Sequence, residues 1–129
     1  MKPEDLKYAK THEWVAVEGD VATVGISAFA VEALTDLVFI ELPKVGAKVQ
    51  PEQPFCEVES VKAVSDVYAP VAGEVIEVNK TLPDRLEILS SDPYGEGWIA
   101  KIRISDDSNL SKLLDYKAYQ KQCAEEEGH

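Results

Sequence analysis

The sequence has few of the residues that build reactive centres. Its 129 residues include two cysteines, Cys56 and Cys123, and two histidines, His12 and His129. The cysteines lie far apart and form no Cys-x-x-Cys motif, which argues against a redox motif and favours a reducing compartment. No recognised ligand spacing joins these cysteines and histidines. The sequence therefore predicts that the protein holds no metal.

Long apolar runs and an excess of positive charge are also missing. No stretch approaches the roughly 20 apolar residues that span a bilayer, and the N-terminus, with Glu4 and Asp5, resembles neither a secretory signal nor a transit peptide. Thirteen basic and 24 acidic residues give a formal net charge of −11, which repels nucleic acid and anionic lipid. We expect a soluble protein that binds neither. It would be cytoplasmic if bacterial, and in the mitochondrial matrix if a presequence has been removed.

Familiar catalytic motifs do not occur either. There is no Gly-x-Ser-x-Gly, no His-Glu-x-x-His, no phosphate loop and no glycine fingerprint for a dinucleotide. His12 and His129 lie near opposite ends of the chain, so a Ser or Cys nucleophile would lack a nearby base. The sequence therefore predicts a non-catalytic protein.

What is present is a series of short β-rich segments separated by turn residues. The expected strands are residues 14–17, 21–26, 37–42, 55–61, 64–68, 74–78 and 98–104, with a loop or very short strand at 47–49. Ser27 is an expected N-cap for a short helix at 28–34, with Phe29, Ala33 and Val31 facing inward. Residues 79–91 show little order beyond a turn at Leu82–Asp84.

Helical spacing returns near the C-terminus. The apolar residues with this spacing are Leu110, Leu113, Leu114 and Ala118. Asp115 is an expected cap of a second helix. We expect one domain over residues 1–129, with a β core at about 14–104 and a C-terminal helical segment at about 106–125. A partly closed β-sandwich fits this order better than a βαβ arrangement.

One lysine stands apart among acidic residues. Lys62 is the only basic residue between Lys48 and Lys80. It falls between two expected strands, where a tight reversal would place it at an accessible loop tip. Lys62-Ala63 lacks the Asn-Gly or Gly-x signature of a two-residue hairpin turn, so the residues alone leave open whether a turn forms here, with a type I turn as one option. An ordinary solvated lysine is the alternative to a functional one.

Several motifs follow one another in an order that is found in one known family. They are Val58-Glu-Ser-Val-Lys-Ala63 followed by Ser65-Asp66 and Pro70-Val-Ala-Gly-Glu-Val75, together with His12-Glu13-Trp14, Val24-Gly25-Ile26, Val38-Phe-Ile-Glu-Leu-Pro43 and Asp92-Pro-Tyr-Gly-Glu-Gly-Trp98. From about Tyr8 to Tyr119 the chain thus resembles the H-protein family of the glycine cleavage system. Biotin carriers typically have Met on both sides of their lysine, and lipoyl domains of 2-oxoacid dehydrogenases have Asp before theirs, whereas Val61 and Ala63 flank Lys62.

The resemblance implies a mainly β barrel-sandwich hybrid, like a lipoyl domain, with a short inner helix and C-terminal helices. It implies a monomeric lipoyl carrier with lipoic acid on Lys62, attached by a lipoyl ligase or octanoyltransferase. The carrier would accept an aminomethyl group from glycine decarboxylase (P-protein) and deliver it to the aminomethyltransferase (T-protein). Dihydrolipoamide dehydrogenase (L-protein) would reoxidise it.

The family motifs also suggest roles for residues around the lysine. Glu13 and Asp66, and with them Thr11, are candidates for a cleft that receives the loaded arm, because a protonated amine there needs acidic partners. Glu59 is a candidate for recognition by the ligase. Ordinary surface charge is the alternative for each acid.

Two departures from the family pattern and two alternative functions accompany this interpretation. Thr35-Asp36 stands where the family usually has Gly-Asp, and Arg85-Leu86 replaces a loop that usually contains proline. One alternative is an H-like protein that relays lipoyl groups to other complexes. The other is an unmodified acidic interaction module.

Overall fold

The structure is a computed structural model that describes residues 2–127. Its strands are β1 (Lys7–Tyr8), β2 (Glu13–Glu18), β3 (Val21–Ile26), β4 (Leu37–Glu41), β5 (Lys48–Val49), β6 (Pro54–Ser60), β7 (Val64–Tyr68), β8 (Ala72–Val78) and β9 (Ala100–Asp106). Its helices are α1 (Ala28–Leu34), α2 (Glu87–Ser91) and α3 (Tyr116–Glu127), and 3₁₀ turns lie at η1 (Pro3–Asp5), η2 (Leu82–Asp84) and η3 (Ser108–Lys112).

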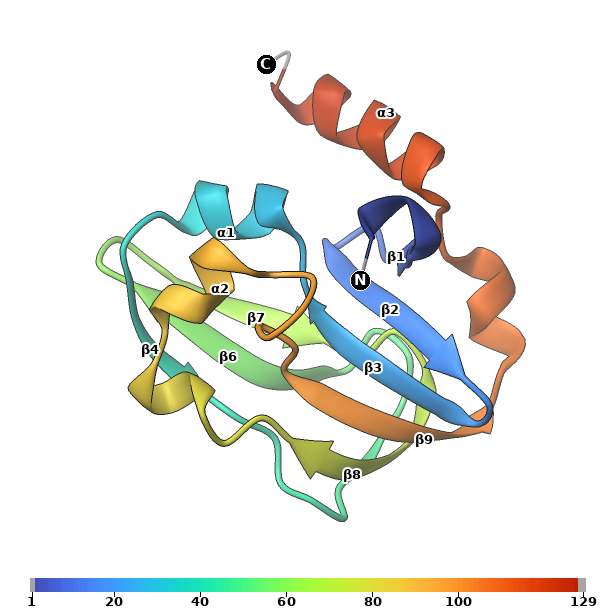
Figure 1. Cartoon of the computed structure of the whole chain (residues 1–129). Helices are drawn as coiled ribbons and strands as arrows, with labels where there is room; N and C mark the ends of the chain where they lie inside the picture. The colour runs from blue at the N-terminus through green and yellow to red at the C-terminus, as the bar shows by residue number, and fades with distance from the viewer. Residues whose placement is uncertain (1, 128–129) are drawn as a thin grey trace.

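The strands form two antiparallel sheets that enclose the core (Figure 1). One is six-stranded in the order β1-β2-β3-β9-β8-β5, and the other is three-stranded in the order β4-β6-β7. Residues from both sheets, including Val24, Val58, Val67 and Ile102, belong to one buried apolar cluster. This mainly β, two-sheet barrel-sandwich arrangement confirms the predicted fold class.

Alternation along β6 shows why these segments become strands. Cys56 and Val58 are buried, whereas Glu57 and Glu59 on the opposite face are partly exposed. A period of two residues places every second side chain on the same face, so an apolar-polar alternation gives a half-buried strand. The bounds expected for β3 and β7 agree with the structure residue for residue.

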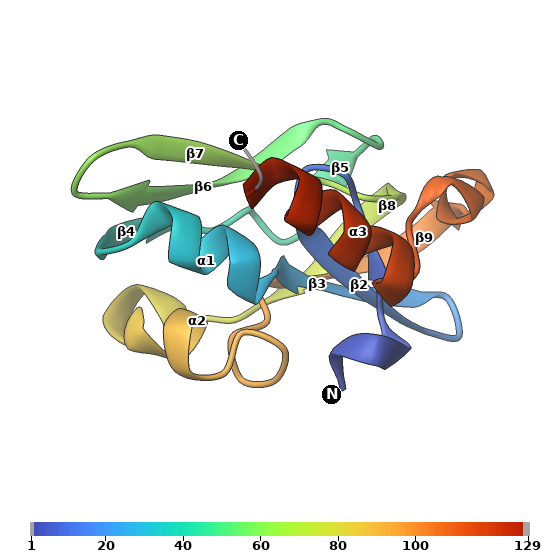
Figure 2. The ribbon, with the colours of Figure 1, turned by 90° about the horizontal axis from the view of Figure 1, so that it is seen from above.

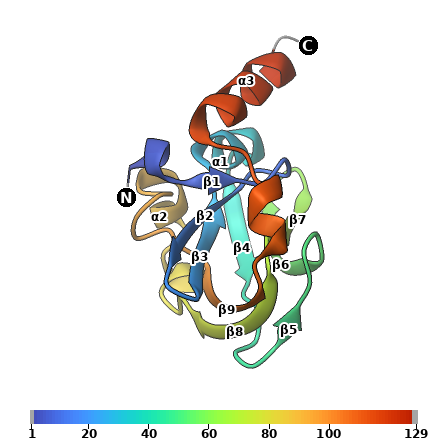
Figure 3. The same cartoon turned by 90° about the vertical axis from the view of Figure 1, so that its right-hand side faces the viewer.

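A second apolar cluster lies under the C-terminal helix. Leu6, Tyr8, Trp14 and Tyr119 are its buried members. The rings of Tyr8 and Tyr119 stack with their centroids 4.3 Å apart. Figures 2 and 3 show that α3 lies outside the two sheets, beside α1 and above β1. The aromatic cluster thus attaches α3 to the end of the six-stranded sheet.

The inward face of α1 differs from the prediction. The N-cap is confirmed, since the Ser27 hydroxyl accepts a hydrogen bond from the Ala30 amide at 3.2 Å. However, Val31 is the buried side chain of this helix, and Ala33 is exposed. Phe29 is half-buried because its ring stacks on His12, with centroids 4.9 Å apart, instead of entering the core.

Two further expectations are corrected between residues 79 and 118. The segment 79–91 contains η2 and α2, and α2 buries Ile88 and Leu89 without a side-chain cap, so its helix depends on packing.

The leucine spacing from Leu110 does not form a continuous helix. Leu114 is extended because its amide and carbonyl pair with Tyr8 at 2.7 and 2.8 Å. Asp115 does cap α3, by accepting a hydrogen bond from the Ala118 amide at 2.8 Å.

Candidate functional site

The loop between β6 and β7 is a hairpin turn, which the local residues had left open. Glu59 pairs with Val64, and beyond this pair the Ser60 amide donates to the Ala63 carbonyl at 2.8 Å. The Ser60 hydroxyl lies 3.1 Å from the Ala63 amide and accepts its hydrogen bond. A serine side chain therefore closes the turn in place of the Asn-Gly signature that the sequence lacks.

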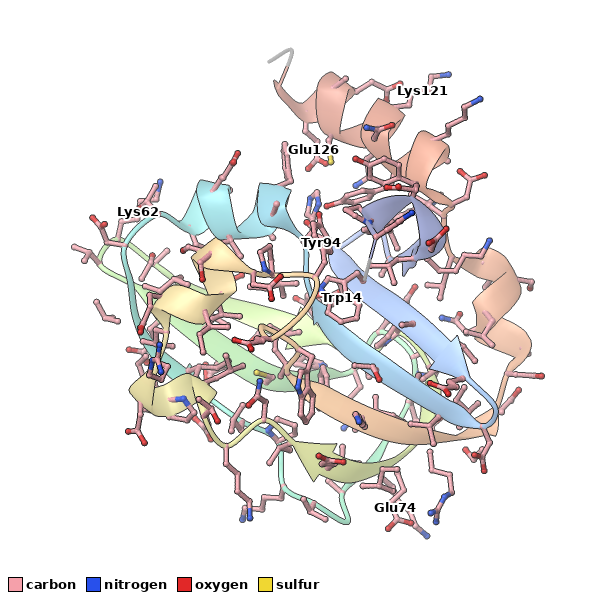
Figure 4. The ribbon with its side chains drawn as sticks, viewed as in Figure 1. Trp14, Lys62, Glu74, Tyr94, Lys121 and Glu126 are labelled. Atoms are coloured by element: carbon pink, nitrogen blue, oxygen red, sulfur yellow. The ribbon has the colours of Figure 1, made fainter. Side chains whose placement is uncertain are left out.

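Lys62 lies at the tip of this hairpin, and its side chain is exposed. Figure 4 shows Lys62 at the outer end of the loop, beside one end of α1, whereas Glu126 lies near the opposite end of that helix. Among the described residues, no hydrogen bond or ion pair holds its ammonium group. The Lys62 amine is thus accessible to a modifying enzyme.

The tip is nevertheless fixed to the body of the protein. The Val61 amide donates to the Asp36 carbonyl at 2.9 Å, which ties the loop to the connection between α1 and β4. Asp36 follows Thr35, whose backbone has φ 63° and ψ −127°. Such a conformation is rarely adopted by a residue with a Cβ atom. The site where the family usually has glycine is therefore a strained backbone position beside the lysine hairpin.

Two valines near the lysine are exposed. Val61 is 73% exposed and Val64 is 59% exposed. Apolar side chains left in water next to a reactive group offer contact area to a partner protein. Glu59 lies on β6 opposite Val64 and is partly exposed, so it is within the same region of the hairpin.

Glu13 is a buried acid at the junction of the two sheets. Its side chain is 1% exposed. It accepts hydrogen bonds from the Thr11 hydroxyl and, at 3.1 Å, from the Tyr68 amide. Because Glu13 begins β2 and Tyr68 ends β7, its carboxylate joins the six-stranded sheet to the edge of the three-stranded one. Burial raises the pKa of Glu13, and the two hydrogen bonds act in the opposite direction.

Asp66 lies elsewhere on the surface. It is exposed on the outer side of β7, opposite Glu57 on β6. A hollow of about 400 Å³ includes Asp66, and a separate groove of about 430 Å³ includes Thr11 and Tyr68. The structure therefore brings Thr11 and Glu13 into contact but places Asp66 in a different depression.

The sequence did not reveal a polar cluster around His12. The His12 ring nitrogens lie 2.7 Å from the Tyr119 hydroxyl and 3.2 Å from a Glu126 carboxylate oxygen. The Tyr119 hydroxyl also contacts the Ser27 hydroxyl at 2.5 Å. These partners are 92 to 114 residues apart in the chain, so no local pattern could have indicated them.

Other candidate chemistry is limited. Cys56 is buried, and burial raises the pKa of its thiol to about 12, which disfavours the reactive thiolate. Between residues 2 and 127, no group of three or more His, Cys, Asp or Glu side chains is arranged to hold a metal ion. No helix in that range has the length and apolarity to cross a membrane.

Comparisons with known proteins identify one family. Residues 6–126 match the family described as Glycine cleavage H-protein. The chain is 52% identical over 125 residues to the glycine cleavage system H protein of Rubrobacter xylanophilus, covering 97% of each. It is 51% identical over 120 residues to the H protein of Thermotoga maritima, covering 93% of this chain and 97% of the relative. A crystal structure of a glycine cleavage system H protein from Mycobacterium marinum superposes with a TM-score of 0.86 at 39% identity, covering 94% of this chain and 98% of that one.

Proposed function

Since the chain belongs to the glycine cleavage H-protein family, whose members are lipoyl carriers and not catalysts, we propose that Lys62 is the residue on which it carries lipoic acid. The supporting observation is the Lys62 hairpin. The amine is exposed, has no hydrogen-bond or ion-pair partner among residues 2–127, and sits on a turn closed by Ser60 and tied to Asp36. An accessible side chain on a loop that a rigid scaffold positions is a common setting for a functional residue.

Lipoic acid bound to Lys62 as an amide would supply a disulfide that can be opened and closed. The protein's own residues present the amine nitrogen and keep the hairpin in one conformation. Acylation also removes the positive charge of the lysine. We expect Glu59 and the exposed Val61 and Val64 to contribute to recognition by a lipoyl ligase or octanoyltransferase.

Glu13 and Thr11 fit a resting place for a cationic group on the extended side chain. Among residues 2–127, no ion pair involves Glu13, so its buried carboxylate has hydrogen bonds but no opposite charge. A buried carboxylate gains stability from a cation, and an amine would be a suitable one. We therefore propose that Glu13, held by Thr11, interacts with the amine that the carrier transports.

Asp66 would meet the extended side chain nearer to its attachment point. It is the third residue of β7, which begins at Val64 just after the turn that carries Lys62, so the two Cα atoms are at most about 13 Å apart at ~3.3 Å per residue. An unmodified lysine side chain reaches only roughly 6 Å from its Cα, and Lys62 forms no ion pair with Asp66. Tyr68, to which Glu13 is hydrogen-bonded, ends β7 about 7 Å beyond Asp66 by the same rise. Asp66 is therefore proposed as an intermediate contact and Glu13 as the more distant one.

The proposed partners are the three enzymes of glycine cleavage. The chain would exchange its aminomethyl cargo with glycine decarboxylase and the aminomethyltransferase, and dihydrolipoamide dehydrogenase would return it to the oxidised state. We propose that it works as one domain and as a monomer. Its proposed location is the bacterial cytoplasm, or the mitochondrial matrix if a presequence has been removed.

Intact mass after incubation with a lipoate ligase, lipoate and ATP tests the attachment site. The parent chain should gain one lipoyl group, and the gain should be lost completely in Lys62→Ala. Lys80→Ala, which removes another exposed lysine near a strand end, is the matched control and should gain the group normally. No gain in the parent, or a gain that persists in Lys62→Ala, would contradict the proposal.

Glycine-dependent bicarbonate exchange with purified glycine decarboxylase then distinguishes a glycine cleavage carrier from a lipoyl relay. The lipoylated chain should support exchange, whereas a pure relay should support none. The Lys62→Ala variant should be inactive in the same assay.

A further inference from the structure

The C-terminal helix holds the short loop that precedes β2. From α3, Gln122 donates to the Lys10 carbonyl at 2.8 Å. The Tyr119 hydroxyl lies 2.7 Å from Nδ1 of His12, and a Glu126 oxygen lies 3.2 Å from Nε2 of the same ring. Figure 4 shows Glu126 on the side of α3 that faces the body of the protein, whereas Lys121 points away from it. Three side chains of one helix therefore contact two residues of one loop.

His12 adopts a backbone conformation that needs such support. Its φ is 83°, a value uncommon for residues other than glycine. Its amide donates to the Ala9 carbonyl, and its carbonyl accepts from the Ser27 amide, both at 2.9 Å. Phe29 stacks on one face of the imidazole ring. Because a left-handed residue persists where its surroundings determine it, contacts from α1 and α3 together hold His12 in place.

The neighbours of His12 are the two residues proposed to receive the amine. Thr11 precedes it and donates its hydroxyl hydrogen to Glu13, which follows it. Glu13 in turn accepts from the Tyr68 amide at the edge of β7. A rotation of the backbone at His12 would move Thr11 relative to Glu13 and disturb both hydrogen bonds.

We infer that His12 is a positioning residue through which the docked α3 helix sets the Thr11–Glu13 pair. This inference rests on the proposed function for the role of Glu13, but its structural content does not depend on lipoylation. The Tyr119 hydroxyl is the central contact. It joins His12 to Ser27, the N-cap of α1, and it is buried, so losing it leaves Nδ1 of His12 without a partner and the Ser27 hydroxyl with the Ala30 amide alone.

Hydrogen exchange of the Tyr68 amide in the unmodified full-length chain reports directly on this arrangement, because that amide donates to Glu13. In Tyr119→Phe, exchange at Tyr68 should accelerate about tenfold, the effect of losing a buried hydroxyl that serves two partners. The Ile104 amide, which donates to the Asp20 carbonyl at 2.7 Å, is the reference and should change less than about twofold. His12→Asn should act like Tyr119→Phe, since asparagine tolerates a positive φ but lacks the ring contacts.

Tyr116→Phe is the matched control. Tyr116 also packs on Tyr8, with centroids 5.9 Å apart, but none of the α3 contacts to the loop comes from it. Removing the Tyr116 hydroxyl should leave hydrogen exchange at the Tyr68 amide unchanged. Unaltered exchange at Tyr68 in Tyr119→Phe or His12→Asn would overturn the inference, as would equal acceleration at Tyr68 and Ile104, which would indicate global destabilisation. A chain that cannot be lipoylated would refute the proposed function without affecting this result.

Discussion

Replacing Thr35 with glycine should stabilise the protein, although it removes a side chain. Thr35 has φ 63° and ψ −127°, a backbone conformation that glycine adopts without strain and other residues adopt at a cost. The backbone carbonyl of the next residue, Asp36, accepts the hydrogen bond from the Val61 amide that holds the lysine hairpin in place. The strain is therefore imposed by the connection that positions the functional loop.

The expected size of the effect follows from opposing contributions. Relief of backbone strain at one such residue is worth about 2 kcal/mol. Glycine loses more conformational entropy on folding, which costs about 0.5–1 kcal/mol. The exposed hydrogen bond from the Thr35 hydroxyl to the Leu34 carbonyl is also lost, a small contribution at an exposed position. The net gain should be about 1 kcal/mol, which corresponds to a rise in Tm of about 4 °C for a chain of this size.

Urea unfolding of the unmodified chain measures this gain, with Thr35→Ala as the matched control. Alanine keeps the Cβ atom and so the strain, but lacks the hydroxyl. It should therefore be no more stable than the parent. If Thr35→Gly is not more stable than Thr35→Ala, backbone strain at this position is not the reason for the difference, and the reasoning fails.

Two more predictions concern Glu13 and Gly73. Because burial raises the folded-state pKa of Glu13 above its ordinary value of 4.5, the parent should lose free energy of unfolding relative to Glu13→Gln as the pH rises from about 4.5 through that raised pKa. Urea unfolding at pH 4.5 and 8 checks this, and a stability difference between parent and variant that stays constant, or that shifts in favour of the parent from pH 4.5 to pH 8, would contradict it. Gly73→Ala should cost about 2–3 kcal/mol, because a Cβ atom there would lie 2.1 Å from the Arg103 carbonyl oxygen. Glu74→Ala, at the next and exposed position of β8, should change stability by less than about 0.5 kcal/mol in the same assay, and equal effects of the two variants would argue against the clash.

Local patterns were sufficient to predict the strands that form the core. β3 and β7 agree residue for residue with the apolar segments, because a two-residue period and bounding turn residues act within a few positions. The N-cap role of Ser27 was also visible, since a cap bonds to an amide three residues away. By contrast, α2 has no capping side chain and is stabilised by the burial of Ile88 and Leu89. The local sequence gives no pattern from which this helix could be predicted.

The candidate site divides in the same way. From the sequence alone, Lys62 could be singled out as an isolated base between two strands, and the motifs around it predicted a lipoyl carrier. The tertiary structure decided that Ser60 closes the turn, that Glu13 is a buried acid joining two sheets, and that Asp66 occupies a different depression from Thr11. The contacts of His12 with α3 were invisible to the sequence, because residues more than 100 positions apart meet only when packing brings them together. Short-range periodicity determines strands and caps, whereas the environment of a carboxylate or an imidazole depends on which distant segments cover it.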